Sequence, residues 1–315
     1  MHFVTATALG ILISGASIGA AAAIGGPSFG DGFSLFDGRP RCQAVTGATA
    51  TNRVMDWDGS DRASINLRGQ ARYTPGTGDR LQASGDPQVL AHLRIRDGIV
   101  ELDCRGWQDR TKDLVITLPG RTFNSFRVSG GGLALDRLDQ ENLSVSIAGS
   151  GKVRANGKAQ NIKFSIAGSG EMDLSQIAAN RGEMKIAGSG TFRAGNVAIV
   201  ELEMGIAGSG RAEFGQLTSR RTEIDIAGSG TVIAKGAVDD LKIDISGSGN
   251  ADFGEVASRT ADADISGRGE VALAPSDAVK IRISGSGDVH LRSDPKNLDT
   301  KISGSGRIHR GGPRI

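Results

Sequence analysis

Aromatic residues are scarce in this sequence, and neither sign of charge is in clear excess. Phe, Trp and Tyr make up 4% of the 315 residues, and 37 Lys and Arg nearly balance 35 Asp and Glu. Surfaces that bind nucleic acid combine a basic patch with aromatic platforms on which bases stack. The composition therefore gives no support for a nucleic acid as a partner.

Long apolar runs are also missing, with one exception at the start of the chain. Beyond this run, no stretch approaches the roughly 20 apolar residues that cross a bilayer as a helix. The run Ala8–Ala23 ends in four alanines and predicts a signal peptide over residues 1–23. Its basic region is reduced to the amino terminus and His2, so an uncleaved membrane anchor is the alternative. Residues 24–41, rich in Gly, Asp and Pro, are predicted to be a linker.

Only two cysteines are present, Cys42 and Cys104. In an exported chain an even number favours a disulfide, and closing a loop of this length stabilises by about 4 kcal/mol in the chain-entropy model. Cys104 follows the alternation of Val100 and Leu102, so its side chain is expected in the core. The alternative is two buried free thiols.

What the sequence does contain is one glycine-rich triplet written ten times. The middle residues of the triplets are Gly131, Ser150, Ser169, Ser189, Ser209, Ser229, Ser248, Arg268, Ser286 and Ser305. Successive intervals are always 18 to 20 residues. Such regularity indicates stacked, structurally identical units. No His recurs beside the serines, and a serine nucleophile needs a positioned base, so the triplets are interpreted as structural.

Each repeat shows the alternation of a half-buried strand. Met184 and Ile186 precede one triplet, and Phe192 and Ala194 follow it, each pair separated by a polar residue. One repeat, expected to form two or three short strands, cannot bury such faces alone, whereas stacking gives every strand a parallel neighbour on both sides. The prediction is an all-β, right-handed parallel β-helix of about ten turns over residues 126–310. Glycines are expected at its corners, where the backbone needs a positive φ.

Residues 42–125 carry strand patterns without the triplet. Their predicted strands are Ala63–Leu67, Leu90–Ile95, Ile99–Cys104 and Leu114–Leu118, with a hairpin signal at Arg96–Gly98. An open end of a β-helix exposes unpaired strand edges. We expect an antiparallel or mixed β layer that forms an N-terminal cap on the first turn.

These features resemble one known family. Leu114–Pro119, Phe126–Gly132 and the serial Ile-Ala/Ser-Gly-Ser-Gly motifs look like the head GIN domain of auto-transporter adhesins. The resemblance spans residues 42 to 310 and carries no catalytic motif. It implies an exported bacterial protein, periplasmic, secreted or at the cell surface, with a β-helical head and an adhesive role.

The outward strand positions are free to serve binding, because the inward positions are committed to the core. Beside Lys242 these positions carry five acidic residues, Glu223, Asp225, Asp244, Asp262 and Asp264. Like charges about 5 Å apart repel, and a Ca²⁺ ion or a basic partner would relieve the repulsion. The alternative is a solvated face that Lys242 partly neutralises and that salt screens.

Histidines are sparse, since the chain has four. His290 and His309 occupy equivalent outward positions in successive repeats and form a zinc candidate, the alternative being two exposed surface residues.

The most direct interpretation is a non-enzymatic, adhesin-like protein without a cofactor. It is expected to bind a surface glycan or an envelope protein through its outward strand faces. The rival is a polysaccharide-active hydrolase or lyase, which needs clustered carboxylates, or a carboxylate with His or Arg, along one groove. The protein is expected to be attached to a membrane only if the signal segment stays uncleaved.

Overall fold

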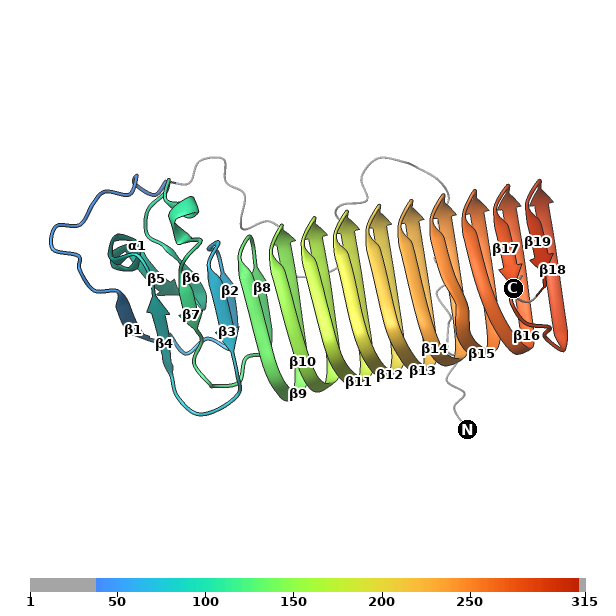
Figure 1. Cartoon of the computed structure of the whole chain (residues 1–315), viewed down its shortest axis with the longest axis horizontal. Helices are drawn as coiled ribbons and strands as arrows, with labels where there is room; N and C mark the ends of the chain where they lie inside the picture. Colours follow the sequence, from blue (N-terminus) through green and yellow to red (C-terminus); the bar gives the residue numbers. More distant parts are fainter. Residues whose placement is uncertain (1–37, 312–315) are drawn as a thin grey trace, which may run out of the picture. The chain divides into compact units, whose positions relative to one another are not determined.

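The computed structural model describes residues 38–311, without the side chain of Ser175. The predicted signal peptide, residues 1–23, and residues 24–37 of the predicted linker lie outside this part of the chain. From Arg39 onward the chain forms one compact unit, in which strands lie side by side in a single ladder (Figure 1). The structure confirms the all-β, parallel β-helical fold predicted from the repeat.

Each repeat forms one turn of the β-helix, and one long strand runs through most of that turn. These strands are β9 (Gly132–Gly149), β10 (Lys152–Gly168), β11 (Glu171–Gly188), β12 (Thr191–Gly208), β13 (Arg211–Gly228), β14 (Thr231–Gly247), β15 (Asn250–Gly267) and β16 (Glu270–Gly285). The last turns are divided into β17 (Asp288–Leu291), β18 (Asn297–Gly304) and β19 (Arg307–Arg310). All of these strands pair in parallel with their neighbours in the stack.

The long strands differ from the two or three short strands expected in each turn. Neighbouring turns bend at equivalent residues, for example Gly168, Gly188 and Gly208, which are paired in register. Their N–H and C=O groups therefore stay opposite partners around these bends, whereas bulges shift the register elsewhere, for example between Phe253 and Ala257 of β15.

The inward side chains form columns that run through the stack and fill its core. In two adjacent columns large and small residues alternate: Phe192 lies beside Ala194, and in the next turn Ala212 lies beside Phe214. The rings of Phe192 and Phe214 are 6.3 Å apart. This exchange keeps the side-chain volume of successive turns similar, as close packing requires.

The N-terminal end of the stack does not follow the order of the chain. One turn consists of β2 (Arg62–Ile65) and β3 (Gln70–Tyr73). On one side it pairs in parallel with β8 (Ser125–Val128) and the start of β9, and on the other side with β6 (Ile99–Leu102) and β7 (Val115–Thr117). The outermost parallel turn thus comes from residues 99–117, which follow β2 and β3 in the sequence.

Antiparallel strands cover this outermost turn. Three strands do so: β5 (Leu93–Arg96) pairs with β6, β4 (Arg80–Ser84) pairs with β7, and β1 (Asn52–Asp56) pairs with β4. The layer over residues 42–125 is therefore mixed, with parallel pairing on its inner side and antiparallel pairing on its outer side. Antiparallel addition satisfies the edges of β6 and β7, which would otherwise stay open.

Two short helices lie in this end layer, α1 (Pro87–His92) and a 3₁₀ turn at Gln108–Thr111. Asp86 caps α1, because its carboxylate accepts a hydrogen bond from Gln88 N. Neither helix in the described part of the chain has the length and apolar character needed to cross a membrane.

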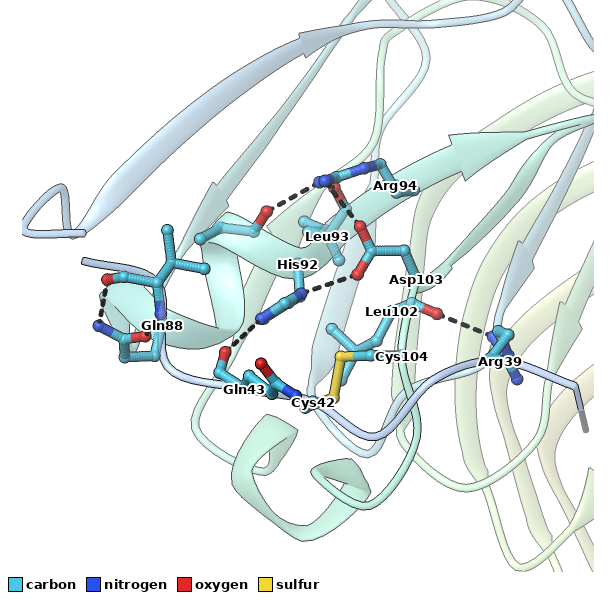
Figure 2. Close-up of polar contacts among 12 residues, drawn as sticks. Arg39, Cys42, Gln43, Gln88, His92, Leu93, Arg94, Leu102, Asp103 and Cys104 are labelled. Carbon is cyan, nitrogen blue, oxygen red and sulfur yellow. Dashed lines mark hydrogen bonds and ion pairs between the residues drawn. A yellow bond between two sulfur atoms is a disulfide. The ribbon is translucent and has the colours of Figure 1, made fainter. Parts of the chain in front are cut away.

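The segment that precedes β1 is fastened to the end layer by side chains (Figure 2). Cys42 and Cys104 form a disulfide with their Cα atoms 4.9 Å apart, and Cys104 is buried. His92 Nε2 lies 2.8 Å from the carbonyl oxygen of Gln43. A covalent and a polar contact thus hold neighbouring residues of the same segment.

Candidate functional site

The stacking aligns charged outward residues on one strand face, which we call the charged face. Its near column contains the residue directly before the inward Ile of each repeat: Ser146, Ser165, Lys185, Gly205, Asp225, Asp244, Asp264, Arg282 and Lys301. Its far column contains the residue two positions earlier: Ser144, Lys163, Glu183, Glu203, Glu223, Lys242, Asp262, Lys280 and Asp299. All five acidic residues singled out in the sequence lie on this face.

Lys242 lies at the centre of the acidic residues. Its Nζ is 2.6 Å from Glu223 Oε1 and 2.8 Å from Asp244 Oδ2. These two hydrogen bonds, that with Asp244 foremost, raise the pKa of Lys242. One ammonium therefore neutralises carboxylates from two neighbouring turns.

Arg282 neutralises two more of the five acidic residues, Asp262 and Asp264. Its guanidinium donates to both carboxylate oxygens of Asp264, with Nη2 and Oδ2 2.5 Å apart, and to Asp262 Oδ1 at 3.2 Å. These contacts offset the repulsion expected from the sequence, because four of the five acidic residues have a cationic partner. The sequence places Arg282 in the near column, but only the structure shows that it reaches Asp262 in the far column as well.

Asp225 is the acid of the five that has no ion-pair partner among residues 38–311. Partial burial of its carboxyl group, followed by the negative charges of Asp244 and Glu223, raises the pKa of Asp225. The remaining electrostatic strain of the charged face is therefore concentrated at one residue.

Three of the carboxylates converge closely enough to share an ion. The candidate ligand atoms of Glu223, Asp225 and Asp244 all lie within 4.8 Å of one another. Oxygen ligands of this kind suit Ca²⁺. However, Lys242 Nζ already contacts one oxygen of Glu223 and one of Asp244, so a cation would have to displace that ammonium. The geometry favours Lys242 over a metal ion as the counter-charge of this cluster.

A shallow groove of about 600 Å³ runs along the edge of the charged face. Its floor has one apolar residue from each of four turns, Leu241, Ala261, Val279 and Leu298. Its charged rim includes Lys242, Asp262, Lys280 and Asp299 on the charged face and Arg221 and Asp240 on the opposite side. An apolar strip beside one line of alternating charge can receive an extended chain.

The histidine pair does not have the geometry of a zinc site. The rings of His290 and His309 stack with centroids 4.7 Å apart and planes inclined by 12°. Zinc lies in the plane of an imidazole that binds it, and nearly parallel planes do not converge on one ion. His290 Nε2 instead lies 3.1 Å from Glu270 Oε1.

A second polar cluster lies in the end layer (Figure 2). His92 Nδ1 is 2.8 Å from Asp103 Oδ1, and Arg94 Nη2 is 2.6 Å from Asp103 Oδ2. These residues and Cys104 could be grouped as metal ligands, but the sulfur of Cys104 is already bonded to Cys42. The cluster therefore holds the end layer together.

The family of the chain follows from its repeat and its fold. The family model described as "Putative auto-transporter adhesin, head GIN domain" matches residues 112–198 and again residues 194–295, which together are more than half of the chain. The chain belongs to this family. The matched residues of the GIN domain include most of the charged face and of the groove, whereas Leu298, Asp299 and Lys301 lie beyond residue 295.

Several solved structures are similar to this GIN-domain chain. One is a "putative lipid binding protein" from Parabacteroides distasonis ATCC 8503, at 18% identity over 82% of this chain and 96% of that chain, with a TM-score of 0.47. A "putative adhesin" from the same strain has 13% identity over 83% and 96%, with a TM-score of 0.49. A "putative adhesin" from Parabacteroides merdae ATCC 43184 has 15% identity over 82% and 95%, with a TM-score of 0.48. No curated protein matches the chain.

Proposed function

We propose that this GIN-domain protein is exported and acts, without catalysis, as an adhesin-like protein that binds a surface glycan or another envelope component through its charged face. The observation that supports this proposal is the alignment of the near and far columns over consecutive turns. A ladder of this kind offers contacts at one regular spacing, close to the strand separation of about 4.8 Å. An extended polymer can meet many such contacts at once, and the groove adds an apolar strip beside them.

Export is supported by two features besides the family. Cys42 and Cys104 lie in a disulfide, a bond that persists in oxidising compartments outside the cytosol. The predicted signal peptide over residues 1–23 would direct the chain there.

The proposal is tested by binding. Chain recovered from the periplasmic fraction is applied to a glycan array and to isolated envelope fractions, beside a variant with Asp225→Asn, Asp244→Asn and Asp264→Asn. These substitutions change the charge of the charged face but not its inward residues, so the fold is expected to persist and binding to fall by at least about tenfold. A control variant with Glu213→Gln, Asp252→Asn and Glu255→Gln removes as many charges from outside the charged face and should bind like the wild type.

Two results would contradict the proposal. Equal binding by the wild type and the charged-face variant would place any adhesive surface elsewhere. Release of reducing ends or unsaturated uronates from a polysaccharide, abolished by Asp225→Asn, would instead establish the enzymatic rival.

A further inference from the structure

The two ends of the β-helix differ in how their outermost strand edges are paired. At the N-terminal end, β4 and β5 cover the outermost parallel turn. At the other end, no strand in residues 38–311 pairs with the outer edges of β18 and β19, which come last in the ladder (Figure 1). An uncovered edge presents N–H and C=O groups that another strand can join.

The inward residues of β18 are exposed as a consequence. Ile302 is 43% exposed, whereas Ile283, its neighbour in the preceding turn, is 2% exposed. Thr300 is also exposed, and Leu298 is only partly buried. The end of a second β-helix with the same cross-section would cover these side chains.

The strand β18 is complementary to itself in one antiparallel register. When two copies pair about a two-fold axis at Thr300, Asp299 lies opposite Lys301 of the second copy, and Leu298 lies opposite Ile302 of the second copy. Each pair joins residues on the same side of the sheet, so apolar residues meet inside and charged residues meet outside. Thr300 meets its own equivalent, and cross-strand threonine pairs and opposite charges both favour pairing.

The charged residues at this edge, Asp299 and Lys301, are not neutralised by an ion pair within the described residues of one copy. Neither Asp299 nor Lys301 has an ion-pair partner among the described residues. In the preceding turn Lys301 is paired in register with Arg282, a residue of like charge, and Asp299 with Lys280. The two-fold register would place a carboxylate on the open side of Lys301 and an ammonium beside Asp299.

We propose that two copies of the chain join end to end through β18, as an antiparallel two-fold pair centred on Thr300. Two-fold, isologous contacts of this type are the commonest in homo-oligomers. A two-fold axis normal to the sheet keeps the same side outward, so the charged faces of both copies look in one direction. The dimer would then present two binding faces to one surface, which raises avidity without any new contact.

The antiparallel register predicts how exchanging the charges at positions 299 and 301 changes dimerisation. Asp299→Lys and Lys301→Asp each place like charges opposite one another in a homodimer, so each should weaken dimerisation by at least about tenfold. The double variant Asp299→Lys/Lys301→Asp restores opposite charges and should dimerise like the wild type. A mixture of the two single variants should form heterodimers, because both contacts across the axis again join opposite charges.

Sedimentation equilibrium over a concentration series measures the dissociation constants of chain recovered from the periplasmic fraction. Arg268→Glu is the control, since Arg268 is exposed at a corner outside β18 and its variant should dimerise normally. Thermal melting verifies that each variant is folded. A wild type that stays monomeric, single variants that dimerise like the wild type, single variants that do not associate on mixing, or assemblies larger than a dimer would each overturn the proposal.

Discussion

Ile166 and Gly190 lie close together in neighbouring turns of the β-helix: a Cβ placed on Gly190 would lie 2.5 Å from Ile166 Cγ2. Ile166 is buried at 1% exposure and cannot move aside without disturbing the core. The first glycine of the same triplet, Gly188, has a φ of +115°, and a Cβ placed on it would lie 2.6 Å from the backbone oxygen of Gly168. Packing thus requires both glycines, and backbone conformation is an additional requirement at Gly188.

Both glycines should be sensitive to substitution by alanine. Gly188→Ala is expected to cost about 1–2 kcal/mol for the left-handed conformation alone, and Gly190→Ala about 1–3 kcal/mol for overpacking. Ser189→Ala, at the exposed residue between them, should stay within about 0.5 kcal/mol of the wild type. Urea unfolding measures all three. A cost for Ser189→Ala equal to that of either glycine would show that the triplet serves a side-chain contact.

The period of the sequence was sufficient to predict which side chains face inward, since in a strand this depends only on alternation. Ile186 and Met204 lie in the core for that reason. The order of the turns at the N-terminal end was not predictable, because the pairing of β3 with both β7 and β9 joins residues far apart in the sequence. Partial neutralisation of the acidic residues by Lys242 was foreseen as the alternative, but the contribution of Arg282 was missed because it depends on how far its side chain reaches, which no periodicity records.

Thr222 is a weak point of the core that can be improved. It is fully buried, and its hydroxyl has no hydrogen-bond partner among the described residues. Its column neighbours are Leu202 and Leu241. Thr222→Val keeps the shape and removes the unpaired hydroxyl, so it should stabilise the chain by about 1 kcal/mol.

Ser219 provides the matched comparison, since its buried hydroxyl donates to Arg221 O at 2.8 Å. Ser219→Ala leaves that carbonyl without its side-chain donor and should destabilise by about 1 kcal/mol. Unfolding free energies that change in the same direction in both variants would contradict this account of the two hydroxyls.

The disulfide should hold one segment rather than the whole β-helix. Non-reduced peptide mapping of chain recovered from the periplasmic fraction is expected to link Cys42 to Cys104. In the variant Cys42→Ser/Cys104→Ser, hydrogen exchange should rise over residues 39–51 and stay unchanged in β12–β15, because each repeat contacts only its neighbours. Two free thiols in the exported wild type, or faster exchange throughout the stack, would show that this assignment is wrong.

Two carboxylates of the charged face should respond to pH with opposite signs. Partial burial and like charges raise the pKa of Asp225, so stability falls as the pH rises from the ordinary Asp value through the raised one. For Glu183, burial acts against the shift, but hydrogen bonds from Lys185 and Lys163 lower the pKa. The stability that Glu183 contributes is therefore present above the ordinary Glu pKa and is lost as the pH falls through the lowered value.

Asp225→Asn should accordingly stabilise the chain at neutral pH, and Glu183→Gln should destabilise it. Both effects should be below about 1 kcal/mol, because both groups keep contact with solvent. Urea unfolding at a series of pH values should show both differences vanishing once the carboxyl groups are protonated. Differences of equal sign at neutral pH would refute the opposite shifts.

The charged face of the wild type is expected not to bind calcium. Lys242 contacts carboxylate oxygens of Glu223 and Asp244, which are two of the three residues whose oxygens converge. Millimolar Ca²⁺ should therefore leave the melting temperature of the wild type unchanged. Lys242→Met removes the ammonium but keeps most of the length of the side chain, so Glu223 and Asp244 lose their ion-pair partner beside the unpaired Asp225. This variant should melt at a lower temperature, and Ca²⁺ should restore part of the loss, because oxygen ligands favour this hard cation.

Lys280→Met, in the same column and without a carboxylate pair, is the control and should not respond to Ca²⁺. A rise in the melting temperature of the wild type with Ca²⁺ would mean that the ion displaces Lys242, and the charged face would then be a calcium site in the native chain.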